Sequence, residues 1–446
     1  MNPYEPMFLP ESIAEIINAL ETAGFSAYAV GGCVRDACLG LDPHDYDLCT
    51  SALPEQTEAV FRDRRLVLAG KKHGTIGVVT ATGVVEITTF RTEGSYRDNR
   101  HPDWVQFVPD VESDLARRDF TVNAMAYSPT RGYADPFGGR EDLRKGILRA
   151  VGDPEKRFQE DALRILRGVR FAVRFGLKVD AATEQAMFSQ AARMDSLARE
   201  RVFEELCKLL PLVTAEDLQR FAPILAAVIP ELKPMLGFDQ RSPHHAYDLF
   251  THVAHVVAGV PAELTLRWAA LLHDIGKVPT FTQDETGRGH FYGHAPKGAE
   301  MAEEVLLRLK APTALRQQVV LLIEKHMTRL QPDKKQLRRQ IGRLGWGTVE
   351  QILLLQEADM GSKGTGESDD PALFAAIRQV MEEIRQEDSC LSLKELAVKG
   401  NDLMALGFSG KAIGQMLNAL LEQVLEENLP NDRETLLSWA EGESHG

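Results

Sequence analysis

The sequence is poor in cysteine, and the few cysteines are not arranged in pairs. There are 5 cysteines among 446 residues, and no two of them form a Cys-x-x-Cys pair. An odd number of isolated thiols excludes a disulfide framework and a zinc knuckle, because both need several closely spaced cysteines. Reduced thiols are typical of a protein that works in a reducing compartment.

Long apolar runs are also lacking. No run approaches the ~18 residues that a membrane-spanning helix requires, and the stretch from Met1 to Glu11 lacks the basic and then apolar order of a signal peptide. The hydrophobic content of 44% and the charged content of 26% are ordinary for a soluble protein. We therefore expect a cytoplasmic protein with no membrane partner.

Positive charge is scarce overall, but it is concentrated locally. The formal net charge of -14 would ordinarily argue against a nucleic-acid partner. From Glu141 to Lys178, however, 10 Lys and Arg stand against 6 Asp and Glu, a net of +4, whereas from Met360 onward 7 stand against 16, a net of -9. A basic segment inside an acidic protein can bind phosphates while the remainder limits unspecific binding.

A glycine turn after an apolar run is the first candidate for a phosphate site. The run over residues 27–30 predicts a short buried strand, and Gly31-Gly32 predicts a turn into a helix that begins at Cys33. Backbone N–H groups at such a turn point outward with partial positive charge, and Arg35 adds a fork of donors for a phosphate oxygen. We therefore expect Gly32 and Arg35 to contact a nucleotide.

Two aspartates one residue apart follow this turn. On a strand, positions i and i+2 face the same side, so Asp45 and Asp47 can share a pair of Mg²⁺ ions beside a triphosphate. Glu86, in a β-branched strand expected nearby, is a third candidate acid, although a solvent-facing glutamate is at least as good an interpretation. Alone, Asp-x-Asp is common in surface loops; together with the glycine turn it predicts a catalytic metal site.

The order of strand, Gly-Gly, helix with arginine and Asp-x-Asp resembles the polymerase-β-type nucleotidyltransferases. The fuller string through Gly40 is similar to the family of tRNA nucleotidyltransferases and bacterial poly(A) polymerases. The resemblance extends to Arg117-Arg118-Asp119 followed by Asn123, and it implies that Arg118 touches the nucleotide. We expect residues 117–127 to begin a helix whose basic start attracts an anion. The alternative is that both arginines pair with Glu112 and Asp114.

The segment 153–176 predicts one amphipathic helix that closes at a glycine and carries a row of charged side chains. A carboxylate only accepts hydrogen bonds and a guanidinium only donates them, so Asp161 and Arg164 suit the base edges of cytosine and adenine but not those of guanine and uracil. The alternative is an exposed face with an Asp161–Arg164 ion pair. Glu-Asp-x-x-Arg resembles the base-reading motif of the same family, and the resemblance implies that Arg167 and Arg170 hold the triphosphate.

Histidines gather in the second half of the chain. Any one of them is more often a core or surface residue than a ligand, but a His-Asp dipeptide at the end of an apolar helix suits a metal. The set resembles the metal-dependent phosphohydrolases called HD domains, which implies a divalent transition metal. The implied ligands are His252, His273, Asp274 and Asp359, with His294 and His326 for a second metal.

The expected fold class is an α+β head of the polymerase-β-type nucleotidyltransferase fold, followed by an all-α neck, body, HD domain and tail. A chain of this length is too long for one core. The predicted domains are a nucleotidyltransferase head over 1–140, a neck with the base-recognition helix over 141–215, a body with the HD domain over 216–360, and a tRNA-binding tail over 361–446.

The resemblance implies an enzyme that adds C and A to the 3′ end of tRNA from CTP and ATP with Mg²⁺, without a template and without a DNA partner. It also implies HD-domain phosphohydrolase activity. Residues 91–104 predict a long loop, which relatives that add only cytidine lack, so adenosine addition is expected. Full CCA addition and addition of the final A alone both stay open. The alternatives are a poly(A) polymerase and an HD metal phosphodiesterase with a nucleotide-sensing head.

Overall fold

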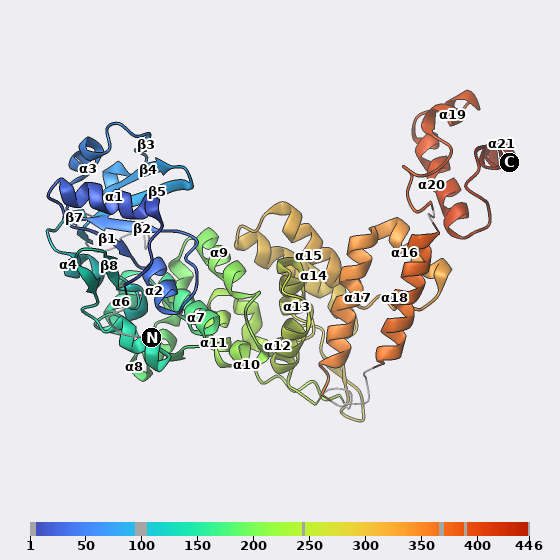
Figure 1. Ribbon diagram of the computed structural model, residues 1–446. Coiled ribbons are helices and arrows are strands. Elements are labelled where there is room, and N and C mark those ends of the chain that lie inside the picture. Colours follow the sequence, from blue (N-terminus) through green and yellow to red (C-terminus); the bar gives the residue numbers. More distant parts are fainter. Residues whose placement is uncertain (1–5, 94–104, 243–245, 365–369, 388–389, 445–446) are drawn as a thin grey trace. The chain divides into compact units, whose positions relative to one another are not determined.

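The computed structural model describes residues 6–93, 105–242, 246–364, 370–387 and 390–444 (Figure 1). The chain divides into two compact units, which are described separately. The first unit holds Met1–Leu212 and Arg220–Pro230, and the second holds Val213–Gln219 and Glu231–Gly446. The predicted head and most of the predicted neck thus belong to the first unit. The finer division into four domains stays a prediction.

A seven-stranded sheet forms the centre of the head, in the order β3-β4-β5-β2-β1-β8-β9. Its strands are β1 (Ala27–Val30), β2 (Asp47–Thr50), β3 (Leu66–Val67), β4 (Thr75–Thr80), β5 (Gly83–Thr89), β8 (Ala126–Ser128) and β9 (Gly132–Ala134). β2 and β5 are parallel, and the other pairs are antiparallel. The predicted strand over 27–30 and the predicted strand that carries Glu86 are confirmed, and β1 is buried along its whole length.

Short helices surround this sheet (Figure 1). In α1 the buried residues Ile13, Ile16, Ile17 and Leu20 recur with helical spacing, so one face packs against the sheet at β1. The helices of the head are α1 (Glu11–Thr22), α2 (Gly32–Cys38), α3 (Pro54–Val60), α4 (Val111–Ala116) and α5 (Gly139–Lys145), with the 3-10 turns η1 (Lys71–His73) and η2 (Thr121–Asn123). The α+β head is therefore confirmed.

The predicted helix over residues 117–127 is wrong. α4 ends at Ala116, and the chain continues through Arg117 into η2 and then β8. Asp119 accepts hydrogen bonds from the backbone N–H of Phe120 at 2.8 Å and from the side chain of Asn123 at 3.0 Å. Such local side-chain bonds compete with helix formation, and Phe120 is fully buried at this bend.

The single helix predicted over 153–176 is interrupted. α6 (Pro154–Glu160) ends at Asp161, whose backbone is extended at φ -146° and ψ 103°, and α7 (Leu163–Phe175) follows. One oxygen of Asp161 accepts the N–H of Leu163 at 3.0 Å, which satisfies one of the free backbone donors at the start of α7. α7 closes at Gly176, with φ +61°, as expected.

The predicted loop over residues 91–104 begins with a strand. β6 (Arg91–Glu93) pairs antiparallel with β7 (Val105–Phe107). The remainder of that loop, residues 94–104, lies outside the described residues.

The first unit continues with helices and one short strand pair. Its further elements are β10 (Ile147–Leu148), β11 (Lys178–Val179), α8 (Ala181–Ser189), η3 (Ala191–Ser196), α9 (Arg199–Leu209) and α11 (Ala222–Val228). β10 and β11 are parallel neighbours, so the predicted neck is not purely helical. α10 (Ala215–Arg220) and η4 (Pro230–Met235) span the boundaries between the two units.

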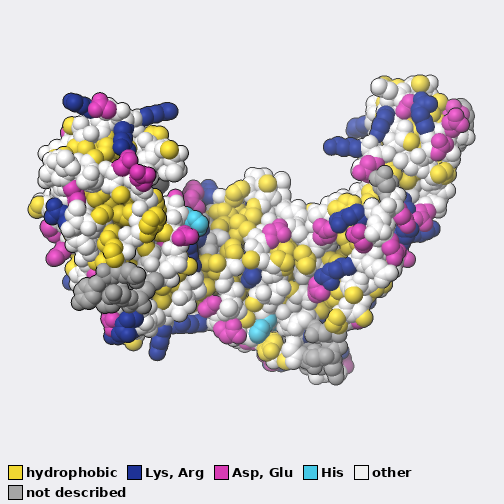
Figure 2. All heavy atoms as spheres, in the orientation of Figure 1, with side chains coloured by type: hydrophobic (Ala, Val, Ile, Leu, Met, Phe, Trp, Pro, Cys, Tyr) yellow, Lys and Arg dark blue, Asp and Glu magenta, His cyan; other side chains and the backbone are white. Residues whose placement is uncertain are grey.

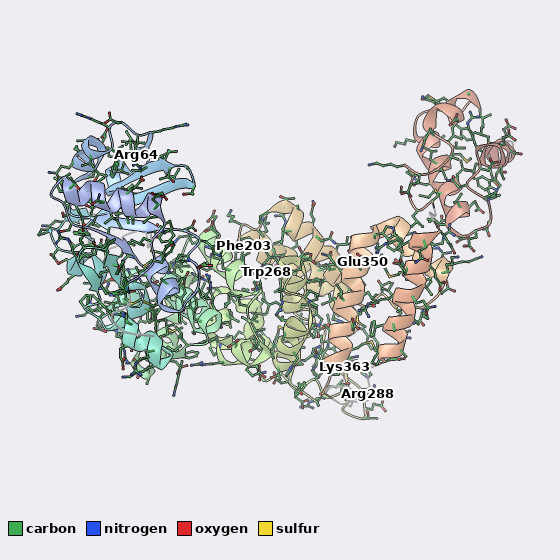
Figure 3. The ribbon with its side chains drawn as sticks, in the orientation of Figure 1. Arg64, Phe203, Trp268, Arg288, Glu350 and Lys363 are labelled. Carbon is green, nitrogen blue, oxygen red and sulfur yellow. The ribbon has the colours of Figure 1, made fainter. Side chains whose placement is uncertain are left out.

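The second unit is mostly helical. Its elements are α12 (Leu249–Gly259), α13 (Leu264–Leu272), β12 (Thr282–Gln283), β13 (Gly289–His290), α14 (His294–Arg308), α15 (Thr313–Lys325), α16 (Lys334–Leu344), α17 (Trp346–Gly361), α18 (Pro371–Gln386), α19 (Gly400–Ala405), α20 (Lys411–Leu425) and α21 (Arg433–Ser444). Trp268 on α13 is fully buried in this core (Figure 3). The hairpin of β12 and β13 departs from the expected all-α body.

Charge is distributed in small groups over both units. Figure 2 shows Lys and Arg side chains interspersed with Asp and Glu on the visible face of each. In the second unit, three arginines of α16 pair with glutamates of α20 or just after it, namely Arg338–Glu427, Arg339–Glu426 and Arg343–Glu422. Among the described residues, none of the helices combines the length and apolar character needed to cross a membrane.

Candidate functional site

The glycine turn of the head lies against Arg118. Gly31 precedes α2 with φ +78° and ψ -122°, and a β-carbon placed on it would lie 2.6 Å from Nη1 of Arg118. The positive φ favours glycine here, and any side chain at this position would displace the guanidinium. Gly32 is the first residue of α2. The structure thus brings together two of the motifs that were predicted separately.

The predicted metal acids lie at the start of β2. Asp47 is the first residue of that strand and Asp45 precedes it, so only one of the two occupies a strand position. Asp47 is in register with Glu86 on the parallel strand β5, which places both side chains on one face of the sheet. All three are exposed. Partial desolvation by neighbouring groups raises the pKa of Asp47. Arg118 opposes this rise, and the charge of Asp45 adds to it.

These three carboxylates do not form a tight ligand group. In the described part of the chain, the groups of three or more potential ligands within 4.8 Å of one another are both in the second unit. Asp45, Asp47 and Glu86 nevertheless offer the oxygen ligands that Mg²⁺ prefers, on an open face of the sheet. Their role as metal ligands stays a prediction.

Arg117 and Arg118 share the carboxylate of Asp114. That side chain is fully buried, lies 2.9 Å from Arg117 and 3.6 Å from Arg118, and also accepts the N–H of Arg91 at 3.3 Å. The alternative interpretation, in which both arginines pair with nearby acids, is therefore correct for Asp114. It does not exclude a nucleotide contact, because Arg118 lies beside both the Gly31 turn and Asp47.

Arg35 is more enclosed than the sequence predicts. It is buried, and its guanidinium donates to Asp36 at 2.7 and 2.8 Å and to Asn123 at 2.6 Å. It also stacks over Phe175 of α7, 4.4 Å from the ring centre. These contacts join α2 to η2 and α7, so Arg35 shapes the site from behind the glycine turn.

Asp119 connects the same segment to α7. Its second oxygen lies 2.7 Å from Arg167. Burial alone would raise the pKa of Asp119, but Arg167, together with the amide of Asn123, lowers it to about 2. The carboxylate is therefore held ionised between α7 and the turn that carries Arg118.

The two residues predicted to read the base do not pair with each other. Arg164 donates to Glu160 at 2.7 Å and to the backbone oxygen of Arg117 at 3.0 Å. Asp161 instead forms an ion pair with Arg201 of α9 at 2.8 Å. The expected Asp161–Arg164 ion pair is wrong, because the break before α7 turns the two side chains toward different partners.

The charged row of α7 is only partly exposed: Arg164 and Arg170 are buried, Arg167 is half-buried and Arg174 is exposed. Arg164 and Arg170 are only 8% and 7% exposed. Arg170 lies 2.6 Å from Glu205 of α9, and both side chains are enclosed. This pairing occupies the guanidinium that the resemblance assigns to the triphosphate, and that assignment stays a prediction.

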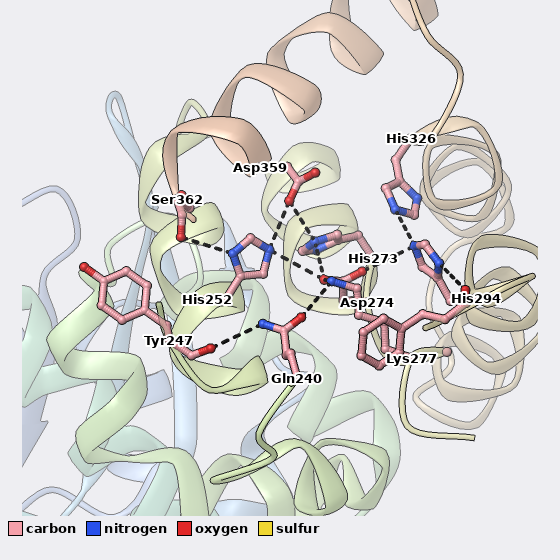
Figure 4. Close-up of polar contacts among 12 residues, drawn as sticks. Gln240, Tyr247, His252, His273, Asp274, Lys277, His294, His326, Asp359 and Ser362 are labelled. Carbon is pink, nitrogen blue, oxygen red and sulfur yellow. Dashed lines mark hydrogen bonds and ion pairs between the residues drawn. The ribbon is translucent and has the colours of Figure 1, made fainter. Parts of the chain in front are cut away.

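The six predicted HD residues converge in the second unit (Figure 4). His252 lies 3.0 Å from Asp359 and 3.5 Å from Asp274, and His273 lies 3.1 Å from Asp274. His294 lies 3.6 Å from the other oxygen of Asp274 and 3.2 Å from His326. The ligand atoms thus form two groups that share Asp274: His252, His273 and Asp274, and Asp274, His294 and His326.

The four imidazoles all point the same nitrogen into this cluster. Each Nδ1–H donates to a backbone carbonyl, at 2.6 to 3.1 Å; the acceptors belong to Ser362, Ala270, Phe291 and Ile323. Such bonds fix the tautomer and leave a lone pair on each Nε2. Two facing lone pairs only 3.2 Å apart, on His294 and His326, repel unless a cation lies between them. The donor set therefore fits a metal.

The protonation states suit the same interpretation. Burial lowers the pKa of His326 to about 4, so its imidazole is neutral at physiological pH. Burial alone would raise the pKa of Asp274, but His273 and Lys277 hold it well below its usual range. Lys277 lies 2.8 Å from Asp274 and also donates to Gln240 at 3.0 Å. The neutral imidazole of His326 and the ionised carboxylate of Asp274 are forms that bind a metal, whereas Asp274 raises the pKa of His273 despite its burial.

Two residues of α9 that contact the predicted site were missed. No motif in the sequence marked this helix, but Arg201 and Glu205 pair with Asp161 and Arg170. The available signal was their spacing of four, which places both on one face of a helix.

Comparison with known proteins relates this architecture to one family. The CCA-adding enzyme of Limosilactobacillus fermentum is 34% identical over 436 residues, which cover 96% of this chain and 96% of the relative. That of Lactiplantibacillus plantarum is 32% identical over 436 residues, covering 95% and 94%. The chain belongs to the CCA-adding enzymes. Family models for the Poly A polymerase head domain and for tRNA nucleotidyltransferase domain 2 match residues 27–149 and 294–440.

Solved CCA-adding enzymes share the fold. The crystal structure of the Bacillus stearothermophilus CCA-adding enzyme in complex with CTP has a TM-score of 0.72 at 28% identity, covering 97% of this chain and 96% of that one. The Thermotoga maritima CCA-adding enzyme complexed with tRNA has a TM-score of 0.60 at 20% identity, covering 98% and 97%. A model described as "Probable RNA and SrmB- binding site of polymerase A" matches residues 176–235.

Proposed function

We propose that this chain adds C and A nucleotides to the 3′ end of tRNA without a template, using CTP, ATP and Mg²⁺. Its membership of the CCA-adding enzymes supports this. The observation that carries the proposal is the continuity of the site within the first unit. Arg118 touches the Gly31 turn, while its two neighbours in the chain, Arg117 and Asp119, bind Arg164 and Arg167 of α7.

In this proposal the tRNA 3′ hydroxyl attacks the α-phosphate of CTP or ATP, and pyrophosphate leaves. The backbone N–H groups at Gly32 and the guanidinium of Arg118 bind the triphosphate. Asp45 and Asp47, with Glu86 as a third candidate, hold Mg²⁺, which supplies charge neutralisation and activation of the hydroxyl. The protein's own contribution is to hold the reacting groups in line.

Base selection rests on Asp161 and Arg164. The carboxylate accepts the exocyclic amine of cytosine or adenine, and the guanidinium donates to the neighbouring ring nitrogen. Guanine and uracil present a carbonyl and an N–H instead, so each would leave buried polar groups unpaired. That the two residues have separate partners supports this division of roles, because neither consumes the other's hydrogen-bonding capacity.

Three tRNA transcripts test the proposal, ending before CCA, after C and after CC, each incubated with one labelled nucleotide at a time. We expect C on the first two ends and A on the third. Addition of A to the CC end alone would restrict the enzyme to terminal A addition. Repeated A on all three ends would support the poly(A) polymerase alternative. Asp47→Asn should abolish incorporation with every transcript.

A second activity, phosphoester hydrolysis, is favoured by the His/Asp cluster of the second unit. Two ligand groups that share Asp274 suit two divalent ions, and imidazole with carboxylate suits a transition metal. A metal bound there would supply an activated water and stabilise charge on a phosphoester. Lys277, held beside Asp274, places a cation at the same edge of the cluster.

Metal analysis and hydrolysis of p-nitrophenyl phosphate and its bis-ester test this activity. Asp274→Asn should lose both bound metal and hydrolysis, whereas His290→Gln, a half-buried histidine on β13 that pairs with Asp284, should keep both. Hydrolysis that survives Asp274→Asn would contradict the assignment. A wild-type protein that hydrolyses the esters but adds no nucleotide would instead support a phosphodiesterase with a nucleotide-sensing head.

A further inference from the structure

The carboxylate of Asp161 is held from two sides. One oxygen accepts the N–H of Leu163 at 3.0 Å, and the other lies 2.8 Å from Nη2 of Arg201. Leu163 begins α7, whereas Arg201 belongs to the first turn of α9, 40 residues further along the chain. The side chains of Asp161 and Arg201 are 14% and 22% exposed, so the contact is shielded from solvent but open on one side.

α9 also contacts α7 at a second ion pair. One helical turn after Arg201, Glu205 pairs with Arg170 of α7 at 2.6 Å. Phe203, between them on α9, is labelled in Figure 3. The two ion pairs have different partners: Arg201 contacts Asp161, which is predicted to read the base, whereas Glu205 contacts the enclosed Arg170 of α7. They therefore form a matched pair for experiment.

We infer that Arg201 is a positioning residue that orients the Asp161 carboxylate and thereby helps this site select C and A over U and G. The inference rests on the proposed function, in which Asp161 and Arg164 read the base. A guanidinium is always charged and donates in a fixed plane, so it fixes the orientation of its partner better than a flexible ammonium does.

The physical consequence is directional. Nη1 of Arg201 also lies 3.5 Å from the oxygen that accepts the N–H of Leu163, so both oxygens are held and the remaining lone pairs point in a constant direction. An exocyclic amine of cytosine or adenine meets an acceptor there, while the carbonyl of uracil or guanine meets a negative oxygen. Without Arg201 the carboxylate keeps one anchor and rotates, so it binds the correct base less well and rejects the wrong base less strongly.

The test is single-nucleotide incorporation with the full-length enzyme, comparing kcat/KM for CTP with that for UTP, and for ATP with that for GTP. Arg201→Met keeps the apolar stem and removes the donors. We expect it to lower both ratios about 10- to 100-fold, mainly through a higher KM for CTP and ATP. Arg201→Lys should restore part of the discrimination. Glu205→Gln should change the rates of all four nucleotides by a common factor and leave the ratios unchanged.

Each outcome decides the matter. Unchanged ratios in Arg201→Met, or an equal loss in Glu205→Gln, would overturn the inference while leaving CCA addition intact. If thermal melting shows that Arg201→Met does not fold, Arg201→Gln is measured in the same way. A wild-type enzyme that adds no nucleotide, or adds U and G as readily as C and A, would refute the underlying function or its base readout, and the role of Arg201 with it.

Discussion

Replacing Gly31 with alanine tests whether the glycine turn sets the position of Arg118. The backbone at Gly31, with φ +78° and ψ -122°, is the mirror image of the β region, which costs a residue with a side chain about 1–3 kcal/mol. The added methyl carbon would lie 2.6 Å from Nη1 of Arg118, against about 3.5–4.0 Å for an ordinary contact. The guanidinium must therefore move by about 1 Å.

A shift of that size in a group that binds the triphosphate should lower kcat/KM for CTP by about 100-fold, or about 2.7 kcal/mol. The assay is steady-state incorporation of CTP on a tRNA transcript that lacks CCA. Urea unfolding of the same preparation separates the loss of stability from the loss of activity. The main change should be in KM, because the displaced group binds the nucleotide before chemistry begins.

Gly132→Ala is the matched control. Gly132 also has a positive φ, of +74°, but no heavy atom lies within 4 Å of its added β-carbon, so the substitution brings strain without a clash. Both variants should lose about 1–3 kcal/mol of unfolding free energy, and only Gly31→Ala should lose nucleotide affinity. Equal kinetics in the two variants would refute the placement of Arg118 at the nucleotide.

Three further outcomes follow from particular contacts. The pKa of Asp119, lowered to about 2, implies stabilisation that is complete above about pH 4 and lost as the pH falls toward 2. The difference in unfolding free energy between wild type and Asp119→Asn, about 2 kcal/mol at pH 7, should therefore vanish in acid urea titrations. Gly276→Ala should lower the melting temperature and the metal content of the second unit, because the new carbon would lie 2.2 Å from the backbone oxygen of His294 and 2.5 Å from the nitrogen of Gly298. Gly414→Ala, on an exposed part of α20 with no neighbour within 4 Å, should instead raise the unfolding free energy by about 0.5–1 kcal/mol, which calorimetry can measure.

The head was predictable where the signal lies within a few consecutive residues. The apolar run over 27–30 and the β-branched run over 75–80 each favour a strand through their own residues, and the glycine pair favours a turn. The structure has both strands and the turn. The break at Asp161 was not predictable from local sequence, because residues 155–167 contain neither proline nor glycine. The conformation there depends on Arg201, which comes from a different helix.

The helix prediction for the segment after Arg117 was wrong for a related reason. Its composition favours a helix, but burial of Phe120 and the contact of Asp119 with Arg167 hold it in an irregular turn. Helix propensity is a weak preference that such tertiary contacts override. In the second unit, the identity of the clustered histidines was predictable from the resemblance to HD domains. Their common orientation was not, since it is set by carbonyls such as that of Ser362, 110 residues from His252.

Asp114 joins three parts of the head through one fully buried carboxylate. It lies 2.9 Å from Arg117 and 3.6 Å from Arg118, and it accepts the N–H of Arg91 at the start of β6. Because a buried carboxylate that loses its partners is left with an uncompensated charge, the three contacts depend on one another. A substitution at any one of them therefore disturbs the charge balance at the other two.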